Sequence, residues 1–156
     1  MLKPAQTMNI EIEVIIGAPV AHVFNALTRD IGKWWGAPYL VDEDRYRTIK
    51  LEPKLGGRMT EVWSATEGSV WGLVTELAKN KRIEISGAIG MAGAVWCKLG
   101  YDLEVVGTGT RLKMIHQGQG EIDEDSAEGY KEGWQDLLGV RLKSFCEKKS
   151  STKKKR

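Results

Sequence analysis

Three side chains in this sequence, His116, Glu61 and Tyr101, could transfer protons if the fold brings them together. An imidazole titrates near neutral pH, so His116 could donate a hydrogen bond to a ligand carbonyl or act as a general acid. Glu61 and Tyr101 would complete an acid–base set only if Glu61 pointed inward, and an unpaired buried carboxylate is costly. No carboxylate neighbours His116 in the sequence to orient its ring. We therefore keep His116 as the candidate for chemistry, favour a structural histidine, and do not predict catalysis.

The two cysteines, Cys97 and Cys146, do not form a metal-binding pattern. They lie far apart, without a CxxC motif or a nearby pair of histidines, so we predict two buried free thiols and no metal site. A phosphate-binding loop, a GxSxG serine motif and a GxGxxG dinucleotide fingerprint are also absent from the sequence. We therefore predict no cofactor.

Basic residues are concentrated at the C-terminal end. Lys or Arg occupies positions 148, 149 and 153–156, although the formal net charge of the chain is only +2. Without these six, 17 of the 23 basic residues remain against 21 acidic ones, so the rest of the chain is acidic overall. We predict a disordered basic tail over residues 148–156, with weak nonspecific contact to nucleic acid or anionic surfaces as the alternative. No specific nucleic-acid partner is expected.

The composition is that of one globular domain. The chain has 156 residues, of which 42% are hydrophobic and 28% charged. It has no apolar run near the roughly 18 residues of a membrane span and no signal peptide, so we expect a cytoplasmic location and no membrane span. We predict a flexible N-terminus over residues 1–8, a domain over 9–147, and the basic tail after it.

The pattern of apolar residues predicts a strand, a short helix and then a series of strands. Residues 10–16 alternate Ile and Val with Glu, which is typical of a half-buried strand. Pro19 begins a short amphipathic helix, and a further turn is predicted at 31–35. Turn signals then separate predicted strands at 46–51, 58–64, 70–78, 82–86, 95–106 and 110–117. The glycine-rich stretch 87–94 is interpreted as a mobile loop or a bent strand edge.

A long helix is predicted after these strands. Asp125 is the expected N-cap, with Glu128 as its capping-box partner. The apolar stripe that follows has helical spacing and consists of Tyr130, Trp134, Leu137, Leu138, Leu142 and Phe145. The fold class is therefore α+β, with a curved antiparallel sheet of about six to seven strands wrapped around the C-terminal helix, and short helices after the first strand.

Strand periodicity predicts which side chains meet that helix. Because inner positions repeat every two residues, His116 faces inward if Met114 does. A gap between sheet and helix would make a site for a small molecule. Its predicted lining is Trp63, Trp71, Leu73, Ile85, Cys97, Tyr101, Met114, His116, Trp134 and Leu138. Trp34 and Trp35 are predicted at the mouth or at the core edge. The alternative is that these rings only fill the core.

Six short motifs occur in order along the sequence. They are the strand at 10–14 with APxxxVFxALT at 18–28, GGR at 56–58, WGLVTE at 71–76, GTRL at 109–112, HxG at 116–118, and GWxxLL at 133–138. These motifs resemble those of the START-like, or helix-grip (SRPBCC), superfamily. Within it they are most similar to the branch related to the C-terminal domain of the activator of Hsp90 ATPase.

The resemblance implies a fold more specifically than a function, because one fold hosts many activities. Members of the superfamily include carriers of apolar ligands, polyketide cyclases and chaperone-associated domains. The Hsp90 activator itself has a separate N-terminal domain that these residues do not include, so we do not expect its full co-chaperone role. We predict a binding domain for a small apolar or amphipathic ligand. The alternatives are a chaperone-interaction or self-associating domain, and a cyclase- or hydrolase-like enzyme using His116.

Overall fold

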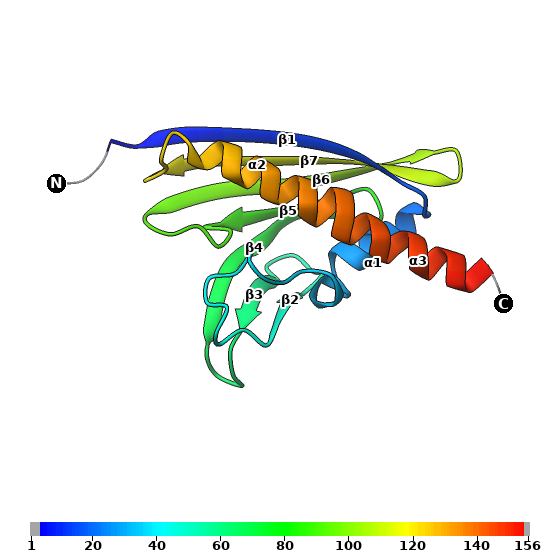
Figure 1. Ribbon diagram of the computed structural model, residues 1–156, viewed down its shortest axis with the longest axis horizontal. Helices are drawn as coiled ribbons and strands as arrows, with labels where there is room; N and C mark the ends of the chain where they lie inside the picture. Colours follow the sequence, from blue (N-terminus) through cyan, green and yellow to red (C-terminus); the bar gives the residue numbers. More distant parts are fainter. Residues whose placement is uncertain (1–3, 155–156) are drawn as a thin grey trace.

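A seven-stranded sheet and a long C-terminal helix make up most of the structure, a computed structural model that describes residues 4–154 and the side chains up to residue 148 (Figure 1). The strands are β1 (Gln6–Ile16), β2 (Thr48–Leu51), β3 (Arg58–Val62), β4 (Gly68–Ala78), β5 (Arg82–Gly87), β6 (Val95–Val106) and β7 (Gly109–Gly120). The helices are α1 (Val20–Leu27), the 3₁₀ turn η1 (Ile31–Lys33), α2 (Ser126–Asp136), the π-helical segment η2 (Leu137–Leu142) and α3 (Lys143–Lys154). The predicted fold class is confirmed.

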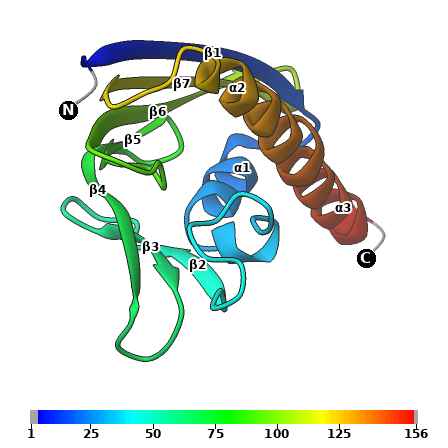
Figure 2. The same cartoon turned by 60° about the vertical axis from the view of Figure 1, so that its left-hand side comes forward.

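All neighbouring strands of the sheet are antiparallel, in the order β1-β7-β6-β5-β4-β3-β2. The first strand, β1, is therefore an edge strand of the sheet and pairs with the last strand, β7. The helix formed by α2, η2 and α3 crosses the concave face of the curved sheet, and α1 lies between this helix and the β2–β3 end (Figures 1 and 2). One face of the sheet is thus covered, which explains why apolar and polar residues alternate along its strands.

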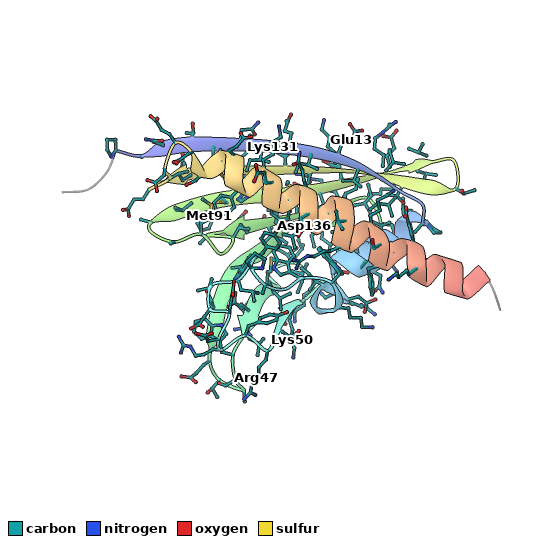
Figure 3. All side chains as sticks on the ribbon, viewed as in Figure 1. Glu13, Arg47, Lys50, Met91, Lys131 and Asp136 are labelled. Carbon is teal, nitrogen blue, oxygen red and sulfur yellow. The ribbon has the colours of Figure 1, made fainter. Side chains whose placement is uncertain are left out.

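The inner face carries the apolar rows that strand periodicity predicted. Leu112, Met114 and His116 of β7 are fully buried, and His116 lies opposite Leu99 of β6 and Ile10 of β1. Side chains fill most of the space between sheet and helix, whereas exposed residues such as Lys50 stand at the β2–β3 end (Figure 3). The inward orientation of His116 is therefore confirmed.

Strand β4 departs from simple alternation. Its pairing shifts register against β3 beside Trp71 and again against β5 between Val74 and Glu76. Each β-bulge adds one residue and reverses the faces of the residues that follow. Trp71 and Val74 are buried in consequence, whereas Leu73 is 45% exposed. The prediction that Leu73 shares the inner face of Trp71 is wrong for this reason.

The C-terminal helix is continuous from α2 to α3 but is not α-helical throughout. Its middle part, η2, has π-helical hydrogen bonding, which the apolar stripe did not reveal. The predicted capping box is not formed, since Asp125 has helical backbone angles and its side chain makes no capping hydrogen bond. Packing of Leu138 and Leu142, both fully buried, holds the helix on the sheet instead.

Two polar contacts fasten the far part of this helix to the end of β1. Lys143 Nζ donates to the Ile15 carbonyl at 2.6 Å, and Gly17 N–H donates to the Glu147 carboxylate at 2.8 Å. Lys143 and Glu147 also form an ion pair at 2.9 Å. These contacts fix where the helix lies across the sheet, and thereby fix the position of its first turns.

The elements at both ends of the chain extend beyond the predicted domain of residues 9–147. Strand β1 begins at Gln6, inside the segment predicted as flexible, and α3 is described to Lys154, inside the predicted tail. Positions 1–3 and 155–156 of those predictions lie outside the described residues. Within residues 4–154, none of the helices is both long enough and apolar enough to span a membrane.

Candidate functional site

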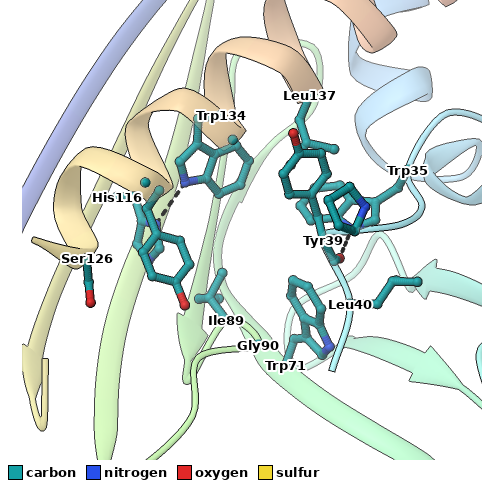
Figure 4. Close-up of a pocket in the computed structure, with 14 residues that line it drawn as sticks. Trp35, Tyr39, Leu40, Trp71, Ile89, Gly90, His116, Ser126, Trp134 and Leu137 are labelled. Carbon is teal, nitrogen blue, oxygen red and sulfur yellow. Dashed lines mark hydrogen bonds between the residues drawn. The ribbon is translucent and has the colours of Figure 1, made fainter. Parts of the chain in front are cut away.

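A cavity of about 390 Å³ opens between the sheet and the first turns of the C-terminal helix (Figure 4). Its helix wall is formed by Tyr130, Trp134 and Leu137, together with Gly129 and Gly133. The sheet contributes His116 and Trp71, and the remaining walls come from two loops. The volume lies within the roughly 300–1,000 Å³ of small-molecule sites.

Three tryptophans from distant parts of the chain meet in this cavity. The ring of Trp35 lies 5.5 Å from that of Trp71 and 5.6 Å from that of Trp134, both at 82°. Such edge-to-face contacts are favourable and hold each ring in one orientation. A rigid aromatic wall is therefore present along much of the cavity, with faces suited to a flat apolar molecule.

Among the described residues, the imidazole of His116 makes one hydrogen bond, to Trp134. The indole Nε1–H of Trp134 donates to Nδ1 of His116 at 3.0 Å, within the buried interior (Figure 4). Because an indole nitrogen can only donate, Nδ1 must be the acceptor, and the proton of the neutral imidazole lies on Nε2. The Nε2 atom is buried and has no hydrogen-bond partner in the described protein. His116 thus carries an unpaired donor.

Burial lowers the pKa of His116 from about 6.5 to about 4, because the charged form loses its solvation. The ring is therefore neutral at pH 7. With Nδ1 occupied and Nε2 protonated, it has no free lone pair to accept a proton. In this geometry His116 is a hydrogen-bond donor, and its one polar partner is an indole rather than a carboxylate.

Glu61 is fully buried, but it does not join an acid–base set with His116. Its carboxylate accepts the backbone N–H groups of Val41 at 2.6 Å and Asp42 at 2.9 Å, and the Nε1–H of Trp63 at 2.8 Å. Because three donors pair with this carboxylate, Glu61 is buried without the cost of an unpaired charge. Glu61 does not line the cavity, and its role here is to hold a loop.

That loop, residues 36–47, is called the strap. Glu61 anchors its middle, and at its start Trp35 Nε1–H donates to the Tyr39 carbonyl at 2.8 Å. The Tyr39 hydroxyl donates to Asp136 of the C-terminal helix at 2.9 Å, and Arg141 pairs with the same carboxylate at 3.1 Å. Burial and the Asp136 carboxylate both raise the pKa of Tyr39. The strap is therefore tied to the sheet on one side and to the helix on the other, beside the cavity.

The predicted lining residues divide into three groups. Trp35, Trp71, His116 and Trp134 line the cavity. The core around it contains, without lining it, Ile85, Cys97, Tyr101, Met114, Leu138 and Trp34. Leu73 and Trp63 lie elsewhere. Leu73 is on the outer face, and Trp63, just beyond β3, packs its ring under the Arg45 guanidinium at 4.1 Å.

One wall of the cavity comes from the loop after β5, which sequence patterns left as a loop or bent edge. Ile89 donates its N–H to the Trp71 carbonyl at 2.9 Å and is buried. Gly90 has φ +74°, and a Cβ there would lie 2.7 Å from the Trp71 ring. Only glycine fits both constraints. The glycines of this stretch were the available signal that its backbone approaches another group closely.

The described residues contain no group of three or more His, Cys, Asp or Glu side chains that could hold a metal ion. Cys97 is buried, with its Sγ 3.7 Å from Met91 Sδ, and burial raises its thiol pKa to about 11. The thiol is therefore protonated at neutral pH and is a poor nucleophile or metal ligand. The chemistry of the site rests on aromatic surface and hydrogen-bond donors.

A curved antiparallel sheet wrapped around a long C-terminal helix, with a cavity between them, is the helix-grip arrangement. Residues 17–147 match the model of the family described as activator of Hsp90 ATPase homolog 1-like protein, and the chain belongs to this family. Among curated proteins, none matches the chain significantly.

Solved structures of similar fold come from several bacteria. An uncharacterized protein from Rhizobium leguminosarum has a TM-score of 0.70 and 18% identity, covering 95% of this chain and 99% of its own. Mll3558 from Rhizobium loti has a TM-score of 0.65 and 23% identity, over 88% and 96%. CV1439 from Chromobacterium violaceum has a TM-score of 0.66 and 19% identity, over 90% and 98%. At these identities the similarity concerns the fold.

Proposed function

We propose that the protein binds a small apolar or amphipathic ligand in the cavity between the sheet and the C-terminal helix. The single observation that carries this proposal is the aromatic cavity itself, about 390 Å³ in volume and lined in part by His116, whose Nε2–H has no hydrogen-bond partner among the described residues. Apolar walls with a few polar groups are typical of small-molecule sites.

Two glycines on the C-terminal helix supply a test of this proposal. A side chain added at Gly129, which lines the cavity, would meet nothing within 4 Å at its Cβ. Gly139, further along the same helix, is equally unobstructed but does not line this cavity. Replacing a helical glycine is generally favourable for the backbone, so both positions should accept leucine.

The experiment is a fluorescence titration with N-phenyl-1-naphthylamine, an uncharged apolar probe. We expect the wild type and Gly139→Leu to bind it with equal affinity, and Gly129→Leu to lose at least tenfold because leucine occupies the cavity. Equal binding by all three proteins would place the probe elsewhere and refute the proposal. Native mass spectrometry of the purified protein complements the titration, since a co-purifying small molecule should be released from the wild type and absent from Gly129→Leu.

Family membership supports a second candidate function, a chaperone-interaction domain. The matched family is described by its relation to the activator of Hsp90 ATPase. Its test is the ATPase rate of Hsp90 with and without the full chain, and an unchanged rate would count against this role. A cytoplasmic location and self-association remain predictions.

The enzyme hypothesis through His116 has less support from the geometry. The imidazole is neutral, and within the described part of the chain its one hydrogen bond is to Trp134, so it is not arranged for general acid–base catalysis. Turnover in a substrate panel that was lost in His116→Asn would revive this hypothesis.

A further inference from the structure

We infer that the ligand of this cavity is uncharged and presents a hydrogen-bond acceptor, as an aromatic ketone or quinone does, to the Nε2–H of His116. The inference rests on the proposed function, because it specifies the class of ligand for the same cavity. It follows from the hydrogen-bonding state of two lining residues and from the charge of the lining.

The donor on His116 is fixed by its neighbour. Trp134 can only donate, so its bond to Nδ1 leaves the proton of the neutral ring on Nε2. Nε2 is buried and has no partner in the described residues 4–154, whereas buried polar groups in folded proteins almost always have one. A ligand acceptor would supply the missing hydrogen bond in a region shielded from water, where such a bond is strongest.

A second residue that lines the cavity also has a buried N–H donor without a hydrogen-bond partner in the described chain. This donor is the indole Nε1–H of Trp71. The Trp71 ring lies across the cavity from His116 in Figure 4, with its nitrogen on the side turned away from the imidazole. Both groups are donors and neither is an acceptor, so neither favours a ligand that presents further N–H groups.

The lining carries no formal charge. None of the cavity-lining residues, all in the described part of the chain, is Asp, Glu, Lys or Arg. His116 is neutral at pH 7, since burial lowers its pKa to about 4. A carboxylate or an ammonium group would lose its solvation here without gaining an opposite charge, which is unfavourable. The acceptor is therefore a neutral oxygen, and a carbonyl is the simplest form on a flat apolar molecule.

Access to Nε2 involves Tyr130. Its ring packs edge-on against the imidazole, with centroids 6.2 Å apart, and Tyr130 is only half-buried. It lies in the first turns of the C-terminal helix, in α2. Rotation of this ring would let a ligand oxygen reach the imidazole from the cavity.

The test compares two tricyclic probes that differ in one group. Fluorenone carries a carbonyl where fluorene carries a CH₂, and fluorene-9-carboxylate adds a charge. In the wild type, measured by quenching of tryptophan fluorescence, we expect fluorenone to bind about tenfold more tightly than fluorene, corresponding to about 1.4 kcal/mol. The carboxylate should bind more weakly than fluorenone. The carbonyl stretch of bound fluorenone should also move to lower frequency than in an apolar solvent.

The matched variant is His116→Asn. Its side-chain oxygen can replace Nδ1 as the acceptor for Trp134, and its amide N–H groups then take the place of the ring carbon Cδ2, so that no donor remains at the position of Nε2. The tenfold preference for fluorenone should disappear in this variant, and fluorene should still bind.

The outcomes separate the two proposals. Equal wild-type affinities for fluorene and fluorenone, an unshifted carbonyl stretch, or a preference that survives in folded His116→Asn would overturn the ligand class while leaving apolar binding intact. Tighter binding of the carboxylate would overturn the neutral acceptor. If none of the probes binds the wild type, the cavity proposal and this inference both fail. If His116→Asn does not fold, the infrared measurement on the wild type decides.

Discussion

Glu61 and His116 are both fully buried polar side chains on the inner face of the same sheet, but their surroundings differ. The carboxylate of Glu61 accepts three N–H groups and ties the strap to β3. The imidazole of His116 accepts one and keeps a donor without a partner. A buried polar group whose hydrogen bonds are complete holds the structure together. A buried polar group at the wall of a cavity that still lacks a hydrogen bond can form that bond with a ligand.

The largest expected effect concerns the packing around His116. Trp134→Ala should lower the free energy of unfolding by about 3–5 kcal/mol, because it removes a buried ring and leaves Nδ1 of His116 without its donor. Urea denaturation would measure this loss. The control is Trp96→Ala, since Trp96 is 57% exposed on the sheet, and its change should stay within about 0.5 kcal/mol. A small loss at Trp134 together with lost probe binding would instead make Trp134 a ligand-binding wall with little role in stability.

Glu61→Leu should lower the free energy of unfolding by about 3 kcal/mol, because three N–H donors lose their acceptor. His116→Asn should lose less, since Trp134 keeps an acceptor for its indole N–H. The pair is compared by urea denaturation under one set of conditions. If His116→Asn proved more destabilising than Glu61→Leu, the contrast between a complete and an incomplete set of hydrogen bonds would be wrong.

Acid should affect the two residues differently. The folded-state pKa of His116 is lowered to about 4, below its ordinary value of 6.5. The stability linked to its neutral form is therefore complete above pH 6.5 and is lost as the pH falls toward 4, to a total of about 3 kcal/mol. Thermal unfolding of the wild type and His116→Asn between pH 7 and pH 4 measures this loss. The wild type should lose more than the variant, and parallel pH profiles would show that His116 does not titrate in this way.

Loosening the strap should have the smallest effect on stability. Tyr39→Phe removes the hydroxyl that bonds to Asp136 but keeps the ring, so the free energy of unfolding should fall by only about 1 kcal/mol. Because this contact ties the strap to the helix beside the cavity, N-phenyl-1-naphthylamine should dissociate faster from the variant in stopped-flow measurements. An unchanged dissociation rate would mean that the strap does not control access to the cavity.

Sequence periodicity predicted the parts of the molecule that depend on local repetition. The alternation along β7 placed His116 on the inner face, and the helical spacing of the last apolar stripe placed Trp134 against it. The order of motifs predicted the fold and the family correctly.

The features that the sequence did not predict depend on contacts between residues far apart in the chain. The bulges of β4 that turn Leu73 outward arise from pairing with two neighbouring strands, and alternation along one strand cannot reveal them. The partners of Glu61 come from the strap, which has no periodic pattern. Ile89 and Gly90 line the cavity only because their loop folds back over Trp71.

The most direct test of the proposed ligand contact is nitrogen-15 NMR of the His116 imidazole at pH 7, with and without fluorenone. We predict a neutral ring with the proton on Nε2 and Nδ1 as the acceptor, and a downfield shift of the Nε2–H proton when fluorenone saturates the protein. A proton on Nδ1, a charged ring, or an Nε2–H signal unchanged by saturating fluorenone would contradict it.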